Sequence, residues 1–354
     1  MRFSAQSLTD IARDILTAAD VSEPRAQQVA ERLVTANLCG HDSHGIGMVP
    51  KYVEGLQSGG LIPKSDAQIV QDHGQALLVD GARGFGQIVA EQAMNWAIER
   101  AKTNKLHLMS LRNSFHIGRI GDWAEMAAEA GLISIHYVNV ISENALVAPF
   151  GGSAARFSTN PYCTGIPAGP NQPMFLLDVA TSQIAHGKAR VAYLSGNETP
   201  PGALIDAKGN LTQDPAVLFE EPKGALTAFG EHKGFGLAML GDLLGGALGG
   251  GMAAGADRTE EGAIINNMSV ILIDPNIFGG ADAFFEEMRG YLDWIKSSPA
   301  APSRDAVLIP GDPERLARSD RGENGIEVDD GTLAQLQETA QLVGLDHSLK
   351  DASL

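Results

Sequence analysis

Residues 106–121 read LHLMSLRNSFHIGRIG, and this stretch decides the fold class. The apolar run at 106–111 is typical of a buried β-strand, and the polar turn at 112–118 leads into a helix that we expect to reach Ala130. In α/β proteins, ligands bind at the exits of such strands, where polar groups gather at the edge of the sheet. The stretch therefore predicts a strand–turn–helix unit and a candidate site.

The same alternation continues on both sides of this stretch. We expect further strands at 76–80, 132–140, 174–179 and 268–273, and helices at 87–102, 233–248, 283–294 and 332–343. Residues 7–56 show helical periodicity instead, with start signals at Ser7 and Ser22. The sequence predicts a mixed α/β fold with a helical N-terminal part at 1–65, which packs with the C-terminal region 281–354, and a central α/β domain at 66–280.

The composition argues against several classes of function. The 354 residues include 26 Lys and Arg against 43 Asp and Glu, a net charge of −17, which disfavours binding to nucleic-acid phosphates or anionic lipids. The two cysteines indicate a reducing compartment. The chain shows neither a signal-peptide pattern near Met1 nor an apolar stretch of transmembrane length. We expect a cytoplasmic protein without nucleic-acid or membrane partners.

A dense polar cluster, GHDSHGIGM, spans residues 40–48. It places two histidines, an aspartate and a serine at the start of a helix, where backbone N–H groups favour anions. Alternatively, Asp42 or Ser43 is a helix cap with the histidines merely nearby. His41 and His44 form at most a weak metal site, because zinc needs three or four ligands and no second cluster supplies them. We therefore expect no metal.

His116, at the exit of the predicted strand, is the second candidate. A histidine can exchange a proton with a carbonyl oxygen, because its ordinary pKa lies near neutrality. Arg112 and Arg119 are suited to a carboxylate or phosphate. The structural alternative is a turn capped by Asn113 or Ser114, with both arginines on the surface.

Two other segments give weaker signals. Asp178 ends an apolar run, where a carboxylate often binds ribose hydroxyls, but it is also a plausible structural cap. Residues 231–236, EHKGFG, open a small-residue helix and indicate either an anion site or close helix packing. The glycines at 81–86 have the wrong spacing for the Rossmann fingerprint, so any dinucleotide would bind without that turn.

Several sequence motifs, which follow one another in order along nearly the whole chain, resemble those of the type-2 malate/L-lactate dehydrogenase family. The resemblance is greatest to the hydroxycarboxylate dehydrogenases of that family. The motifs lie at 40–45, 113–118, 149–152, 159–161, 178–181, 232–236 and 310–311. The resemblance implies a homodimer with a non-Rossmann α/β fold and a mixed sheet. It also implies that the central domain binds NAD(H) or NADP(H) in an extended cleft and interconverts small 2-oxo and 2-hydroxy acids.

The resemblance also assigns roles to individual residues. His116 matches the proton donor and acceptor, and His44 the active-site histidine beside nicotinamide and substrate. Substrate contacts would be Ser43, Met48 and Arg119. Cofactor contacts would be His44, Gly118, Arg119, Ile120, Leu176, Leu177, Asp178, Val179, Ala180, His232, Lys233, Asn266, Gly311, Asp312, Pro313 and Glu314. Asn266 rests on the resemblance alone.

Met48 departs from the family pattern, because many members carry an arginine there that suits a substrate carboxylate. An apolar side chain at this position indicates a larger or more apolar 2-oxo acid, whose carboxylate would bind Arg119, Arg112 or backbone donors. Two alternatives remain open at this point. One is a cyclic-imine reductase of the same family, and the other is a metal-assisted hydrolase built on His41 and His44.

Overall fold

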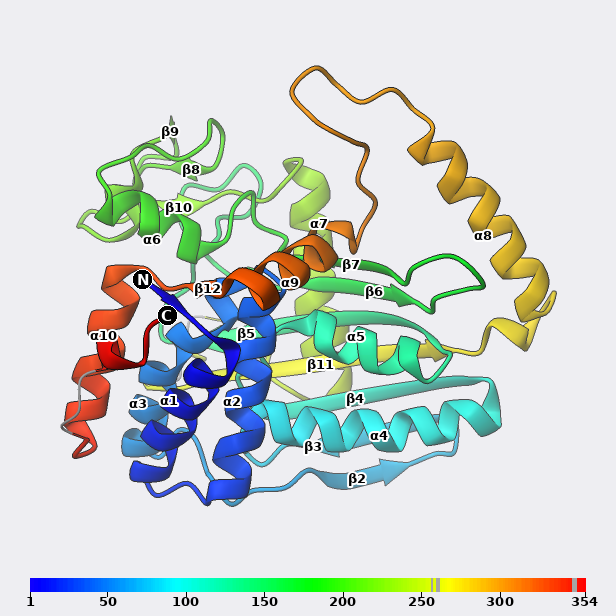
Figure 1. Ribbon diagram of the computed structural model, residues 1–354, viewed down its shortest axis with the longest axis horizontal. Helices are drawn as coiled ribbons and strands as arrows, with labels where there is room; N and C mark the ends of the chain where they lie inside the picture. Colours follow the sequence, from blue (N-terminus) through cyan, green and yellow to red (C-terminus); the bar gives the residue numbers. More distant parts are fainter. Residues whose placement is uncertain (256, 259–261, 346–348) are drawn as a thin grey trace.

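A mixed sheet forms the centre of the computed structural model, which describes residues 1–255, 257–258, 262–345 and 349–354 (Figure 1). Across the sheet its seven strands are β2 (Gln68–Asp72), β3 (Ala76–Asp80), β4 (Leu106–Phe115), β11 (Ile264–Ile273), β5 (Ile133–Ser142), β6 (Tyr162–Ile166) and β7 (Phe175–Val179). β3 and β4 are parallel, and every other neighbouring pair is antiparallel. The carboxyl ends of β3, β4, β5 and β7 therefore meet at one edge, and the predicted mixed α/β class is confirmed.

β4 runs four residues further than the sequence predicted. The expected turn begins at residue 112, but the strand continues to Phe115. Asn113 takes a positive φ of 54°, and the pairing of β4 with β11 shifts register between Asn266 and Met268. This irregularity lets polar residues continue the strand, and it brings His116 to the edge of the sheet.

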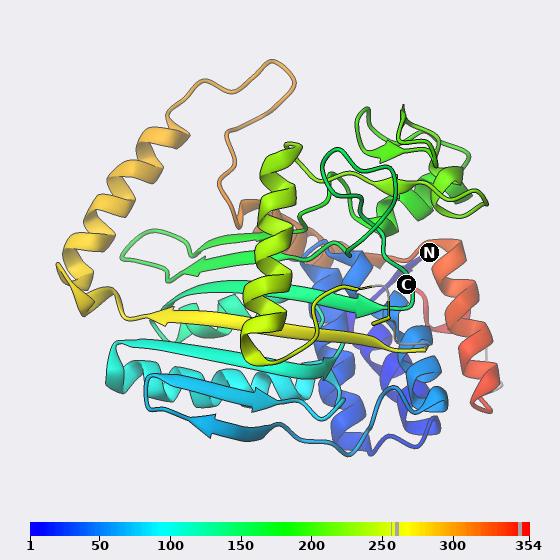
Figure 2. The same ribbon diagram turned by 180° about the vertical axis from the view of Figure 1, so that it is seen from behind.

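Helices cover both faces of the sheet. α4 (Gly86–Asn104) and α5 (Ile120–Glu129) lie on one face, and α7 (His232–Leu240) lies on the other (Figures 1 and 2). The helix predicted at 233–248 is not regular, because α7 passes into a π-helix at Gly241–Gly246 and a 3₁₀ turn at Ala247–Gly249. A Cβ at Gly245 would lie 2.6 Å from the carbonyl oxygen of Tyr137, so this glycine permits close contact with β5.

The N-terminal helices pack at the edge where the carboxyl ends meet. They are α1 (Ala5–Ala18), α2 (Glu23–Leu38) and α3 (Val49–Ser58), with 3₁₀ turns η1 (Asp42–His44) and η2 (Ile46–Met48) before α3. β1 (Arg2–Phe3) pairs with β12 (Ile326–Glu327), and α10 (Asp330–Leu342) contacts α3. The C-terminal segment thus returns to the N-terminal helices, although the division into parts at 1–65 and 66–280 stays a prediction.

The remaining elements lie at the margins of the sheet. α8 (Ala281–Lys296) projects from the body and leads through a long loop to α9 (Asp312–Asn324) (Figure 1). α6 (His186–Leu194) lies beside a small sheet of β8 (Leu204–Ile205), β9 (Leu211–Thr212) and β10 (Ala225–Leu226). Short 3₁₀ turns occur at Pro215–Leu218, Pro275–Ile277 and Leu349–Ala352. Among the described helices, none combines the length and apolar composition that a bilayer crossing requires.

Candidate active site

His116 and His44 come together although 72 positions separate them in the sequence. His116 directly follows β4, and His44 ends η1; their rings are nearly parallel, at 10°, with centroids 5.6 Å apart. Ser43 lies beside them, with its Oγ 3.1 Å from Nδ1 of His44. The two candidate clusters of the sequence therefore form one site.

The turn that carries His44 is held by Asn37. The side chain of Asn37 donates to Asp42 Oδ1 at 2.7 Å and accepts from the backbone N–H of Ile46 at 2.8 Å. A Cβ at Gly45 would lie only 2.2 Å from Asn37 Oδ1, so glycine is required there. Arg321 of α9 also binds Asp42, at 2.6 Å. The turn is thereby fixed to both α2 and the C-terminal segment.

Burial makes both histidines weak bases. It lowers the pKa of His116 to about 3, and the neighbouring His44 contributes in the same direction. It lowers the pKa of His44 to about 4, against the opposing effect of the Asp178 carboxylate. Both rings are therefore neutral at neutral pH, and a neutral imidazole can accept a proton from a hydroxyl group.

Two residues behind His116 were missed by the sequence reasoning. Tyr52 Oη lies 2.8 Å from Nδ1 of His116, and Gln87 Nε2 lies 2.5 Å from the same hydroxyl. The Tyr52 ring packs against Phe85 and Phe115. Nothing in the local sequence marks either residue, because both occupy ordinary positions on helices.

Arg119 does not lie on the surface as a free cation. Its side chain is buried and forms ion pairs with Asp122 at 2.8 Å and Glu125 at 3.0 Å, and its Nε lies 3.9 Å from Asp178 Oδ2. Burial alone would lower the pKa of the guanidinium, but the two carboxylates raise it. Arg112 is likewise paired, with Asp80 at 3.0 Å. Both arginines proposed for an anionic ligand thus already have carboxylate partners.

The segments predicted to bind a cofactor form one continuous wall. Asp178 Oδ2 accepts from the backbone N–H of Gly121, at 2.8 Å, in the first turn of α5. The backbone N–H of Leu176 in β7 donates to Pro310, just before Gly311, at 3.3 Å. These bonds join the segment of Gly118, Arg119 and Ile120 to that of Leu176, Leu177, Asp178, Val179 and Ala180, and to the first turn of α9 with Gly311, Asp312, Pro313 and Glu314.

The wall also reaches the histidine turn. His41 Nε2 lies 3.2 Å from Glu314 Oε1, whereas Glu314 Oε2 is buried without a hydrogen-bond partner among the described residues. A buried carboxylate oxygen without a partner fits a ligand that carries hydroxyl groups. In the part of the chain that the structure describes, no group of three or more potential ligands gathers around a metal position.

Asn266 and His232, which the resemblance assigns to the cofactor, lie on different elements. Asn266 Oδ1 accepts from the backbone N–H of Ile117, at 2.9 Å, and so holds the residue after His116 in place. His232 begins α7 and lies edge-on to Phe150, with ring centroids 5.8 Å apart. His232 and Lys233 are both exposed.

Met48 ends η2, half-buried against the apolar core of the N-terminal helices.

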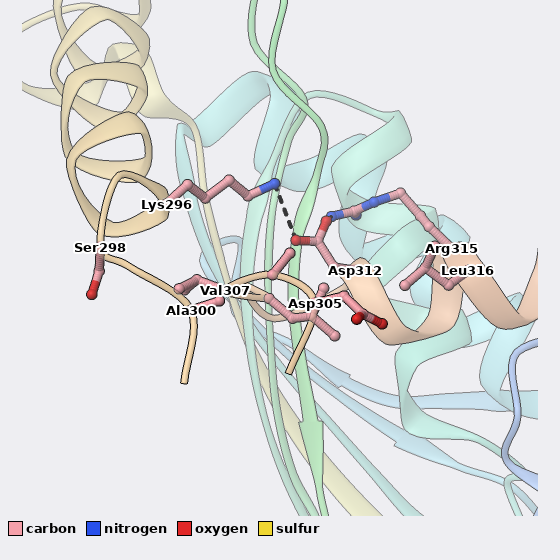
Figure 3. A pocket seen from close by; sticks show the side chains of 10 residues that line it. Lys296, Ser298, Ala300, Asp305, Val307, Asp312, Arg315 and Leu316 are labelled. Atoms are coloured by element: carbon pink, nitrogen blue, oxygen red, sulfur yellow. Dashed lines mark hydrogen bonds and ion pairs between the residues drawn. The ribbon is translucent and has the colours of Figure 1, made fainter. Parts of the chain in front are cut away.

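A cavity of about 640 Å³ lies away from the histidines, between the end of α8 and the start of α9 (Figure 3). Lys296 and Arg315 line it, at 3.1 and 2.5 Å from the Asp312 carboxylate, together with Val307 and Leu316. The cavity thus adjoins the last predicted cofactor segment.

Comparison with known proteins agrees with the fold. The malate/L-lactate dehydrogenase family profile matches residues 3–337. Hydroxycarboxylate dehydrogenase B of Escherichia coli O157:H7 is 43% identical over 97% of this chain and 95% of its own length. Two solved structures are similar throughout. Sulfolactate dehydrogenase from Methanocaldococcus jannaschii has 33% identity and a TM-score of 0.85, covering 99% of both chains. Δ1-Piperideine-2-carboxylate reductase from Pseudomonas syringae pvar. tomato has 29% identity and a TM-score of 0.81, covering 96% of this chain and 100% of its own.

Proposed function

Because the chain belongs to the malate/L-lactate dehydrogenase family, we propose that it interconverts 2-oxo and 2-hydroxy acids with NAD(H) or NADP(H). Relatives are named dehydrogenases of hydroxy acids, which supports an oxidoreductase. The observation that carries the proposal is the pair of His116 and His44, neutral and stacked at the carboxyl edge of the sheet. It places a proton acceptor beside a wall of backbone donors and carboxylates.

The residues of the wall fit a nicotinamide dinucleotide. Asp178 and Glu314 are suited to ribose hydroxyls, because Glu314 Oε2 is buried without a hydrogen-bond partner among the described residues and Asp178 lies near the carboxyl end of β7. The cavity beside Asp312 offers apolar side chains and two cations to the far end of such a ligand (Figure 3). When bound, the nicotinamide gives or takes the hydride at substrate C2.

His116 carries the substrate proton in this proposal. During oxidation its neutral ring takes the hydroxyl proton, and during reduction the protonated ring returns it to the carbonyl oxygen. His44, whose ring is nearly parallel to that of His116, would contact both substrate and nicotinamide in this proposal. Because Arg119 and Arg112 are paired, we assign the substrate carboxylate to Ser43, His44 and backbone donors of the η1–η2 turn.

The test is the oxidation of NADH and NADPH against a panel of 2-oxo acids. We expect turnover with one or both nucleotides, a loss of about 100-fold or more in kcat for His116→Gln, and nearly unchanged nucleotide binding in that variant. Wild-type turnover in His116→Gln would refute the role of His116. Absence of any nucleotide oxidation across the panel would refute the function.

Met48 supports a preference among the substrates. Its thioether replaces a potential cationic partner for a second carboxylate, so we propose that phenylpyruvate-type substrates exceed oxaloacetate in kcat/KM. A strong preference for the dicarboxylate would contradict this assignment.

A second candidate function is the reduction of a cyclic imine. The structural similarity to Δ1-piperideine-2-carboxylate reductase favours it, because the same hydride would attack a C=N bond. Cyclic imines in the same panel separate the two functions: a kcat/KM for the imine well above that for every 2-oxo acid would establish the reductase.

We also propose a cytoplasmic homodimer. Cys39 and Cys163 are buried and unpaired, which supports a reducing compartment. On the outer face of the sheet, the helix that contains α7 exposes Met239, Leu240, Leu243 and Leu248. In a chain with a net charge of −17, a face of this kind lets two copies meet without bringing like charges together.

A further inference from the structure

Three buried polar groups form a chain that ends at His116. Gln87 of α4 is 1% exposed, Tyr52 of α3 is 0% exposed, and His116 is 8% exposed. Tyr52 Oη lies between the two partners, 2.5 Å from the Gln87 amide and 2.8 Å from Nδ1 of His116. Because the hydroxyl has a single proton, its direction decides which nitrogen of His116 carries hydrogen.

With the amide nitrogen of Gln87 toward Tyr52, as placed, the hydroxyl donates to Nδ1. A neutral His116 then carries its hydrogen on Nε2 and has no lone pair there for a substrate proton. Gln87 Oε1 is left buried, with no hydrogen-bond partner among the described residues. This arrangement holds the ring in place but does not provide a base.

A half-turn of the amide reverses every donor in the chain. The amide oxygen and nitrogen are nearly identical in shape, so the half-turn needs no change in packing. We propose that Gln87 turns its oxygen to Tyr52, so that Tyr52 donates to Gln87 and accepts Nδ1–H of His116, which leaves Nε2 to exchange the substrate proton.

We call the hydrogen-bonded chain of Gln87, Tyr52 and His116 the relay. The proton that leaves the substrate is the proton that His116 gains, so the total number of protons is conserved. In oxidation the substrate hydroxyl proton moves to Nε2, and the resulting imidazolium keeps its Nδ1–H bond to the Tyr52 oxygen. Burial raises the pKa of the Tyr52 phenol, so Tyr52 stays protonated throughout. Tyr52 and Gln87 are therefore positioning residues, and neither supplies the transferred proton.

The titrating groups around His116 are few. His44 of η1 lies against its ring, and Tyr52 of α3 binds its Nδ1. Asp178 of β7, His41, just before η1, and Arg119, just before α5, act on His44. Among these groups Gln87 contacts only Tyr52, so a change at Gln87 reaches His116 through Tyr52, and a shift in the pH profile reports on the relay.

The kinetic test compares Gln87→Glu with Gln87→Met. A carboxylate at this position accepts from Tyr52 and adds negative charge, whereas a thioether of similar size is a poor acceptor. We expect Gln87→Glu to keep kcat within about tenfold of wild type, and Gln87→Met and Tyr52→Phe to lose roughly 10- to 100-fold with a similar KM.

The pH profile of kcat/KM for hydroxy-acid oxidation separates the proposed role from a purely structural one. A loss of packing would lower kcat/KM without shifting the pH at which the profile bends. Its acidic inflection should shift to higher pH in Gln87→Glu, because added negative charge stabilises the imidazolium. It should shift to lower pH in Tyr52→Phe, which removes the acceptor of Nδ1–H. Tyr193→Phe, which removes an exposed hydroxyl bonded to Glu220, is the matched control. Equal rates for the two Gln87 variants, or unshifted inflections, would overturn the relay.

A second measurement does not need the Tyr52 or Gln87 variants. In wild-type protein labelled with ¹⁵N-histidine at about pH 8, with the signals of His116 assigned by their loss in His116→Gln, we expect a protonated Nδ1 and a bare Nε2. Hydrogen found on Nε2 instead would overturn the proposal. The use of Nε2 rests on the proposed function, but the tautomer is measured without turnover. A protein with the expected tautomer and no oxidoreductase activity would refute the function and leave the relay standing.

Discussion

Acidification should destabilise the protein through a histidine that has no part in the proposed chemistry. His136 of β5 is fully buried, and neither of its ring nitrogens has a hydrogen-bond partner in the described residues. It lies between Cys163 and Val270 in a row across the sheet, on the face covered by α4 and α5. Burial lowers its pKa from 6.5 to about 3. His136 therefore stays neutral in the folded protein where an unfolded chain would take up a proton.

The sign and size of the effect follow from this difference. Below pH 6.5 the unfolded chain binds a proton at this position that the folded protein does not, so the free energy of unfolding falls as the pH falls toward about 3. At about pH 4.5, two pH units below the unfolded pKa, the loss is about 3 kcal/mol for this residue. The loss should be absent above pH 7.

Urea unfolding at pH 7.5 and 4.5, at one protein concentration, measures the effect. His136→Met conserves volume and removes the titrating group. We expect its free energy of unfolding to fall on acidification by about 2 to 3 kcal/mol less than that of the wild type. The exposed His73→Gln should behave as wild type does. An equal loss in wild type and His136→Met would refute the reasoning.

Three further substitutions test other parts of the structure. Met48→Arg should raise kcat/KM for oxaloacetate relative to phenylpyruvate by about tenfold or more, as measured by steady-state kinetics, because it supplies a partner for a second carboxylate. Arg119→Met should lower the free energy of unfolding by about 3 to 5 kcal/mol in urea titrations, because it leaves Asp122 buried without its ion-pair partner, whereas Glu125 keeps Arg318. Leu243→Glu should convert the proposed dimer to monomers, as measured by light scattering, because it places two charges in the proposed interface.

The sequence predicted those helices and strands in which the apolar residues repeat at the spacing of the element and are buried in the structure. The strand at 76–80 and the helices of residues 7–56 were found because their apolar residues repeat at the expected spacing. β2 was missed, because all five of its residues are exposed and show no alternation. The end of β4 was placed too early, because the pairing of Asn113 and Ser114 depends on a distant strand, β11.

For the candidate site, local sequence marked the groups but not their partners. His116 and His44 stand out among glycines and polar residues, and their stacking agrees with a shared role. The pairing of Arg119 with Glu125 was not predicted, because a charged residue in a turn is usually exposed. Tyr52 and Gln87 could be assigned only from their contacts with His116, which depend on how α3 and α4 pack at the end of β4.

The low pKa of His116 has a consequence for the reduction of a 2-oxo acid. Burial holds this pKa at about 3 and that of His44 at about 4, yet reduction requires a protonated ring. A substrate carboxylate within about 4 to 6 Å would raise the pKa of a histidine by about 1 to 3. With Arg119 and Arg112 paired elsewhere, we expect the positive charge that meets the substrate carboxylate to come from a histidine that binds a proton together with the anion. Calorimetry at about pH 5, in two buffers of different ionisation enthalpy, should therefore show proton uptake when an unreactive 2-oxo acid analogue binds. The KM for the 2-oxo acid should rise by up to about tenfold per pH unit between the pKa of the free protein and the raised pKa of the complex, at about pH 4 to 6. Binding without proton uptake, together with a KM independent of pH, would mean that the carboxylate is neutralised by a cation already present in the free protein.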